Sequence, residues 1–127
     1  MKVLLSIKPE FVEKIFAGTK KYEFRKSLFK KSGVKYVVIY ASAPIKRVVG
    51  EFEIDDILSD DVDIVWDRTK KYSGISKAFY KSYFQNKKTA NAIQIGHIKK
   101  YEKAKSLSDY NIQQAPQSFC YVTEELV

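Results

Sequence analysis

Charged side chains of both signs lie close together near the N-terminus, in the stretch GTKKYEFR at residues 18–25. If this stretch enters a strand, Glu23 and Arg25 share one face, because residues two apart point the same way, and Lys20 lies at the mouth of the strand. Ammonium and guanidinium groups bind phosphate oxygens, and a carboxylate accepts a hydrogen bond from an exocyclic amine such as that of cytosine. The set therefore predicts a site for a nucleotide-like ligand.

A simpler interpretation of the same stretch remains open. Charged residues keep a solvated edge strand soluble, and Glu23 and Arg25 then form an internal ion pair. Such a pair contributes typically ~0 to 1 kcal/mol at an exposed site.

The elements on either side of the charged stretch are expected to place it at one end of a sheet. An apolar run at 3–7 predicts a buried strand, and Pro9 stops it and suits the first turn of a helix over 9–17. Apolar residues recur in that helix at helical spacing: Phe11, Val12, Ile15 and Phe16. Gly18 follows as a left-handed C-cap, and alternation over 21–25 then indicates a strand.

Two further polar residues are expected to join this site. Lys8 and Ser42 each lie near the end of a predicted strand, at 3–7 and 36–43. If the two strand ends converge, the cleft holds an ammonium, a guanidinium, a carboxylate and a hydroxyl. The predicted ligand-binding residues are Lys8, Lys20, Glu23, Arg25 and Ser42.

The rest of the chain reads as further strands with a helical insertion. Strands are predicted at 36–43, 47–58, 90–101 and 116–122, and helices at 60–71 and 77–85. Gly50 indicates a bulge or a bend in its strand, and Trp66 is expected in the core. His97 is taken as a surface or hydrogen-bonded residue, because no Cys or second His accompanies it as a metal ligand.

These elements predict an α+β fold. Five to six strands of non-local order with short peripheral helices describe a small closed or partly closed β-barrel. Strand and helix do not alternate regularly, which argues against a doubly wound sheet. Neither a P-loop nor a dinucleotide-binding glycine motif occurs, so the common nucleotide cradles are absent.

Composition predicts one globular domain over 1–127, with 45% hydrophobic and 30% charged residues. Cys120 is the only cysteine, so we expect no disulfide, no cysteine-based zinc site and a cytoplasmic location. No metal or cofactor is predicted. The apolar run at the N-terminus is too short for a signal peptide or a membrane span.

The net charge of +8 is distributed in blocks. Residues 1–40 and 70–105 are strongly basic and flank an acidic block at 41–69. Two basic blocks folded onto one face would attract the phosphates of a nucleic acid, and RNA is the predicted partner. Ordinary solvated lysine-rich surfaces are the alternative. The oligomeric state stays open.

The spacing Gly18-x-Lys20-x-x-Glu23-x-Arg25, after the helix at 9–17, resembles the signature of the ASCH domain family, a branch of the PUA-like β-barrels. The blocks YASAP (40–44), VGEF (49–52), YSGI (72–75) and PQSF (116–119) also resemble small prokaryotic ASCH proteins. The resemblance implies a barrel with a cleft beside the motif that binds RNA or a modified nucleobase. Some members of the family are described as predicted transcriptional regulators.

Enzymatic alternatives come with the same resemblance. One branch is similar to an amidohydrolase acting on acetylated cytidine, in which a threonine three residues after the motif lysine is the nucleophile. Glu23 stands at that position here, so this activity is not carried over. Glu23 remains a candidate general base, with Lys20 beside it as the second candidate catalytic residue. Other members resemble ribonucleases, and a protein-interaction role for the helix at 77–85 also stays open.

Overall fold

The computed structural model describes residues 1–122, and the last five residues of the predicted single domain lie outside the described residues. Its elements follow one another along the chain as β1 (Lys2–Ile7), α1 (Pro9–Ala17), β2 (Tyr22–Arg25), β3 (Tyr36–Ala41), β4 (Arg47–Asp61), α2 (Val62–Thr69), α3 (Lys77–Tyr83), β5 (Thr89–Lys105) and β6 (Phe119–Val122). Short 3₁₀ helices at Lys70–Tyr72 and Leu107–Tyr110 complete the described elements. No helix within residues 1–122 is both long and apolar enough to cross a membrane.

The strands form one six-stranded mixed sheet in the order β2-β5-β4-β3-β1-β6. Only the β1–β3 pair is parallel among these neighbours, and the other four are antiparallel. The predicted α+β class is confirmed. The sheet is not a closed barrel, because β2 and β6 are its two edges and do not pair with each other within residues 1–122.

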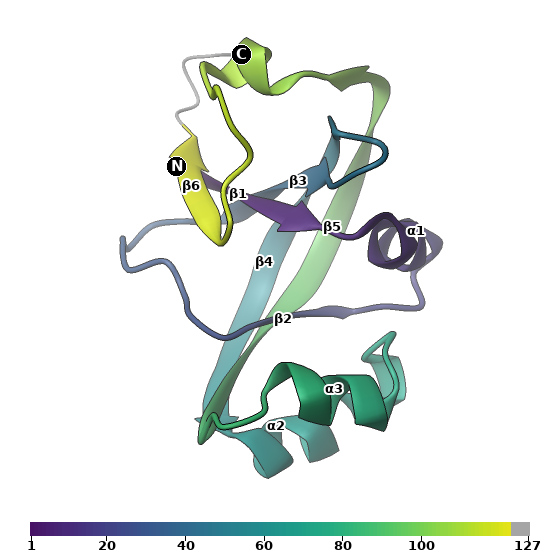
Figure 1. Ribbon diagram of the computed structural model, residues 1–127, viewed down its shortest axis with the longest axis vertical. Helices are drawn as coiled ribbons and strands as arrows, with labels where there is room; N and C mark the ends of the chain where they lie inside the picture. The colour runs from purple at the N-terminus through teal and green to yellow at the C-terminus, as the bar shows by residue number, and fades with distance from the viewer. Residues whose placement is uncertain (123–127) are drawn as a thin grey trace.

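Two long strands carry the sheet from one end of the molecule to the other (Figure 1). β4 and β5 both extend beyond the predicted ranges, and α2 and α3 are inserted between them and lie together at one end. The pairing of β4 with its neighbours shifts register beside Gly50, as predicted for a bulge. A Cβ at Gly50 would lie 2.6 Å from the Lys99 carbonyl oxygen and 2.9 Å from the Phe16 ring, so only glycine fits there.

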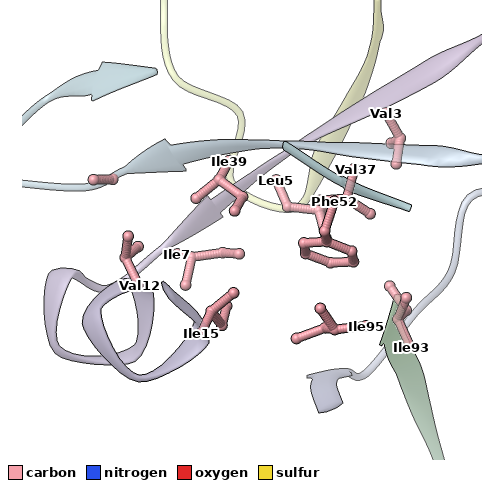
Figure 2. Packing of buried hydrophobic residues seen from close by; sticks show 11 residues of the cluster. Val3, Leu5, Ile7, Val12, Ile15, Val37, Ile39, Phe52, Ile93 and Ile95 are labelled. Carbon is pink, nitrogen blue, oxygen red and sulfur yellow. The ribbon is translucent and has the colours of Figure 1, made fainter. Parts of the chain in front are cut away.

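Helix α1 has the predicted bounds and the predicted ends. Pro9 starts it, and Gly18 ends it with φ 82°, where its N–H donates to the carbonyl oxygens of the last turn. The buried side chains of Val12 and Ile15 pack α1 against the sheet. Figure 2 shows this core, in which they meet Leu5, Phe52 and Ile95 and bury apolar area that stabilises the fold.

A second core lies under α2 and α3. The Trp66 ring of α2 packs 4.8 Å from the Tyr80 ring of α3, which confirms the predicted core position of Trp66. α2 is shorter than predicted at both ends, because Asp61 caps it by accepting from the backbone N–H of Asp63 at 2.9 Å and a 3₁₀ helix follows it. α3 begins after its cap Ser76, as predicted, and ends two residues before the predicted boundary.

Candidate functional site

A cavity of about 260 Å³ opens between the end of β1, the start of α1, β2 and α3. Its lining combines charged and aromatic side chains from segments that are distant in sequence. The lining residues are Ser6, Ile7, Lys8, Phe11, Lys20, Glu23, Phe24, Arg25, Ile75, Phe79 and Tyr83.

Local structure explains why the charged residues face the cavity. The left-handed Gly18 ends α1 and turns the chain back, and the backbone N–H groups of Thr19 and Lys20 both donate to the Lys14 carbonyl oxygen. Lys20 therefore enters the cavity just before β2 begins. Glu23 and Arg25 follow at alternating positions of β2 and point to the same side.

Lys20 is a buried ammonium held by specific contacts. Its side chain is only 2% exposed, and its Nζ donates to the Ser73 carbonyl oxygen at 2.7 Å. The same Nζ lies 5.1 Å from the centre of the Phe11 ring and 4.9 Å from that of Phe24, where the faces of the rings attract the positive charge. Burial lowers the pKa of Lys20 to about 8, against the opposing effect of the Glu23 carboxylate.

Gly74 holds the aliphatic part of the lysine in place. Its φ is +70°, and a Cβ at this position would lie 2.5 Å from Cβ and 2.6 Å from Cγ of Lys20. The backbone of the loop before α3 therefore packs directly on the lysine stem. Lys14 also connects α1 to this loop, since its Nζ donates to the Gly74 carbonyl oxygen at 2.9 Å.

Glu23 is a buried carboxylate with one unused oxygen. The residue is 6% exposed, and Oε2 accepts from Nη1 of Arg25 at 3.3 Å. Oε1 accepts no hydrogen bond from residues 1–122. Burial raises the pKa of Glu23, while the charges of Lys20 and Arg25 act in the opposite direction.

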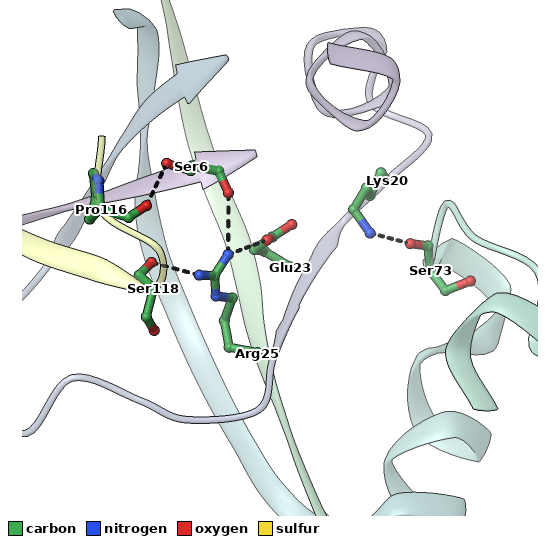
Figure 3. A network of polar contacts seen from close by, with 7 residues as sticks. All are labelled: Ser6, Lys20, Glu23, Arg25, Ser73, Pro116 and Ser118. Carbon is green, nitrogen blue, oxygen red and sulfur yellow. Dashed lines mark hydrogen bonds and ion pairs between the residues drawn. The ribbon is translucent and has the colours of Figure 1, made fainter. Parts of the chain in front are cut away.

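Arg25 connects three parts of the fold, as Figure 3 shows. Its Nη1 donates to the Ser6 carbonyl oxygen at 3.4 Å as well as to Glu23, and its Nη2 donates to the Ser118 carbonyl oxygen at 2.6 Å. Ser6 in turn donates from Oγ to the Pro116 carbonyl oxygen at 3.0 Å. The guanidinium thus links β2 to β1 and to the segment before β6, and it orients the Glu23 carboxylate.

Aromatic rings form the outer wall of the cavity. Phe11 and Phe79 meet edge to face with their centres 5.4 Å apart. Two lysines that the burial pattern places at the surface lie over rings of this wall: Nζ of Lys8 is 5.4 Å from the Phe79 ring, and Nζ of Lys26 is 4.9 Å from the Tyr83 ring. The cavity therefore has a charged interior and an aromatic, basic rim.

Four of the five predicted binding residues line this cavity: Lys8, Lys20, Glu23 and Arg25. Ser42 does not belong to its lining. Ser42 follows β3, where its backbone N–H donates to the Ile7 carbonyl oxygen at 3.0 Å and so extends the pairing of β3 with β1.

Sequence reasoning did not identify the aromatic wall or Lys26 as parts of the site. Phe79 and Tyr83 lie within the helix predicted at 77–85, and the mixture of aromatic residues and lysines in that segment is the sequence signal for them. Lys26 directly follows the charged stretch. Its position beside a ring of α3 depends on tertiary contacts that residue spacing does not encode.

The model of the ASCH domain matches residues 5–125 of the chain. The crystal structure of ASCH from Zymomonas mobilis superposes with a TM-score of 0.89 at 26% identity, over 98% of this chain and 90% of that one. A point mutant of the same Zymomonas mobilis protein superposes equally well. These similarities confirm the predicted PUA-like fold.

Curated relatives carry different names. An ASCH domain-containing ribonuclease from Zymomonas mobilis is 32% identical over 89 residues, which are 70% of this chain and 60% of that protein. Large ribosomal subunit protein uL22 from Ureaplasma parvum is 29% identical over 94% of this chain, and ATP synthase subunit alpha from the same species is 31% identical over 94%. The chain spans 39% of that ribosomal protein and 15% of that synthase subunit.

Proposed function

The chain belongs to the ASCH domain family, and we propose that it binds single-stranded RNA or a nucleotide through the cavity beside β2. The observation that carries this proposal is the presence of a buried ammonium, Lys20, and a buried carboxylate, Glu23, in one recess walled by aromatic rings. Single-stranded RNA is recognised by stacking of bases on aromatic side chains and by hydrogen bonds to base edges. The cavity offers both.

The rim supplies the contacts for phosphate. Lys8 and Lys26 are exposed and lie beside the rings of Phe79 and Tyr83, so a base among the rings brings its phosphates near both ammonium groups. Arg25 already donates to a carboxylate and two carbonyl oxygens. We therefore assign phosphate binding to the two lysines and a positioning role to Arg25.

Other evidence is consistent with an RNA ligand. The chain carries a net charge of +8, which favours a polyanion. One relative is named a ribonuclease. The relatives reported above do not bear names that indicate transcription, and the roles of the ribosomal protein and the synthase subunit belong to proteins of which this chain spans a minor part.

Cleavage of RNA is the second candidate function, favoured by the unused oxygen of Glu23. A carboxylate in this position can accept the proton of a ribose 2′-hydroxyl while the 2′-oxygen attacks the neighbouring phosphorus. The bond from phosphorus to the 5′-oxygen breaks, and the leaving 5′-oxygen takes a proton from water. Lys20 lies in the same cavity and can stabilise the negative charge that develops on the phosphate oxygens. In this reaction the products are a 2′,3′-cyclic phosphate and a 5′-hydroxyl.

A salt titration tests the binding proposal. A fluorescent single-stranded RNA should bind with an affinity that falls steeply with salt, by a slope of about 0.7 in log–log units for each phosphate contact. The variant Lys8→Ala/Lys26→Ala should lower that slope by about 1.4. Lys87→Ala/Lys88→Ala removes the same charge from an exposed segment outside the cavity and should leave it largely unchanged. Salt-independent binding, or none, contradicts the proposal.

Product analysis separates a binder from an enzyme. The protein is incubated with a mixed RNA pool and, separately, with acetylated cytidine, and the products are identified by mass. Cyclic phosphate ends that form with the parent protein but not with Glu23→Gln support cleavage. RNA that stays intact while still binding leaves the binding function and contradicts the second candidate. Release of acetate from acetylated cytidine would instead favour the amidohydrolase activity.

A further inference from the structure

The unused oxygen of Glu23 is exposed to the cavity and not sealed in protein. Within residues 1–122 no fully buried side-chain nitrogen or oxygen lacks a hydrogen-bond partner. Oε1 of Glu23 has no hydrogen-bond partner in this described part of the chain, although the residue is 6% exposed and lines the cavity. This oxygen must therefore lie where the cavity can supply a donor. An acceptor of this kind is a recognition element that the protein itself does not satisfy.

A donor lies beside this acceptor. Figure 3 shows the Glu23 carboxylate between the Arg25 guanidinium and the Lys20 ammonium. Lys20 gives one of its protons to the Ser73 carbonyl oxygen at 2.7 Å, which leaves further N–H bonds for a ligand. The backbone of Gly74 packs on the lysine stem as far as Cδ and so limits the positions that the ammonium can take. Glu23 therefore offers the cavity its unused Oε1 and the remaining lone pair of Oε2, and Lys20 offers one donor beside them.

We propose that this cavity selects guanine among unpaired bases, with Glu23 accepting from N1–H and the 2-amino group and Lys20 donating to O6. The inference rests on the proposed function and names the base that the same site reads. The aromatic rings of Phe11, Phe79 and Tyr83 supply the stacking surface for the purine.

The hydrogen-bonding edges of the other bases do not match this order of groups. Guanine alone places two donors side by side next to an acceptor. Adenine and cytosine place a ring-nitrogen lone pair beside their amino group, which repels the second oxygen of an ionised carboxylate. Uracil has a single N–H between two carbonyl oxygens, which face the carboxylate unfavourably. An unmatched buried polar group costs more than a missing contact, so the preference should be large.

Calorimetric titration with the four nucleoside monophosphates tests the inference. GMP should bind roughly 5- to 150-fold more tightly than AMP, CMP or UMP, the discrimination expected of one bidentate pair. IMP keeps N1–H and O6 but lacks the 2-amino group, and it should bind between GMP and the others. This comparison needs no variant, so it does not depend on whether a substituted protein folds.

Substitution then assigns the preference to the carboxylate. Glu23→Gln replaces one acceptor by a donor and should abolish the preference for GMP. Glu13→Gln makes the same chemical change on the exposed side of α1 and should preserve it. Equal binding of the four nucleotides, or tighter binding of another base, overturns the inference and leaves the proposed function in place. Failure of every nucleotide and of single-stranded RNA to bind overturns both.

Discussion

The guanidinium of Arg25 donates to the carbonyl oxygen of Ser118 at 2.6 Å across the two edges of the open sheet. Arg25 ends β2, one edge strand, and Ser118 immediately precedes β6, the other. A side chain therefore closes a gap that no backbone ladder spans within residues 1–122. Because the same guanidinium also donates to Glu23, the closure of the sheet and the orientation of the cavity carboxylate depend on one residue.

Arg25→Lys should weaken both the contact between the two sheet edges and the orientation of the Glu23 carboxylate. A lysine ammonium has no fork and cannot reach the Ser6 and Ser118 carbonyl oxygens together with Glu23. Hydrogen bonds to charged groups are worth about 1.5–3 kcal/mol, so the free energy of unfolding should fall by about that amount in a urea titration. Amide hydrogen exchange should also quicken in β6.

Arg68→Lys is the matched control for this substitution. Arg68 is exposed on α2, and its side chain makes no hydrogen bond or ion pair with the described residues 1–122. Its replacement should change the free energy of unfolding by less than about 0.5 kcal/mol. Equal effects of the two substitutions would show that Arg25 does not hold the edges together.

Gly74→Ala should be more destabilising than Gly33→Ala. Both glycines have left-handed backbones, with φ +70° and +81°, so alanine meets a similar backbone penalty of about 1–3 kcal/mol at each. At Gly33 a Cβ would find no atom within 4 Å, whereas at Gly74 it would overlap Lys20. The difference between the two unfolding free energies measures the packing on the lysine, and no difference would contradict it.

The stability of the protein should depend on pH through Lys20. Its pKa is about 8 in the folded state against an ordinary 10.5, so between these values the unfolded state binds more protons and stability rises with pH. Lys20→Met removes this effect. The variant should therefore lack the rise in the free energy of unfolding, roughly 1–3 kcal/mol, that the parent protein gains between these pH values.

The difference in free energy of unfolding between the two proteins should shift in favour of the parent protein as the pH rises from 8 towards 10.5. Urea titrations at a series of pH values give both curves, and subtraction cancels the groups whose pKa the substitution leaves unchanged. Glu23 and Lys14 are the charged groups that act on the Lys20 ammonium. Both residues are kept, and loss of the Lys20 charge raises the pKa of Glu23. A difference in free energy of unfolding that stays constant across this range would mean that Lys20 keeps an ordinary pKa.

Phe79→Ala should reduce RNA affinity far more than stability. The ring is 37% exposed and lines the cavity, and stacking of one base on an aromatic ring is worth about 1–3 kcal/mol, or roughly 5- to 150-fold in affinity. Tyr72→Ala is the control, since this ring is 40% exposed, also lies under a lysine and does not line the cavity. Equal RNA affinities of the two variants would mean that the base does not stack on Phe79.

Local sequence signals were sufficient for the parts of the site that are close in sequence. The helix from Pro9 to Ala17, its cap at Gly18 and the alternation of β2 were all predicted from residue types within a few positions of one another. These three features are what place Lys20, Glu23 and Arg25 on one side. They depend on steric limits of the backbone and on the two-residue repeat of a strand.

Contacts between residues that are far apart in the sequence could not be predicted from these local signals. Ser118 lies 93 residues from Arg25, and Phe79 and Tyr83 belong to a helix inserted between the two longest strands. Ser42 was expected in the site, yet the pairing of β3 with β1 uses its backbone and leaves it outside the cavity lining.

The amino-acid sequence alone therefore determined the family signature, the α+β class and the charged side of β2, since these follow from short-range geometry and residue type. Tertiary structure alone decided which carbonyl oxygens accept hydrogen bonds from Arg25 and which oxygen of Glu23 stays unused. It also decided how deeply Lys20 is buried. Burial sets the pKa of a charged group, and burial is a property of all the elements that pack around it.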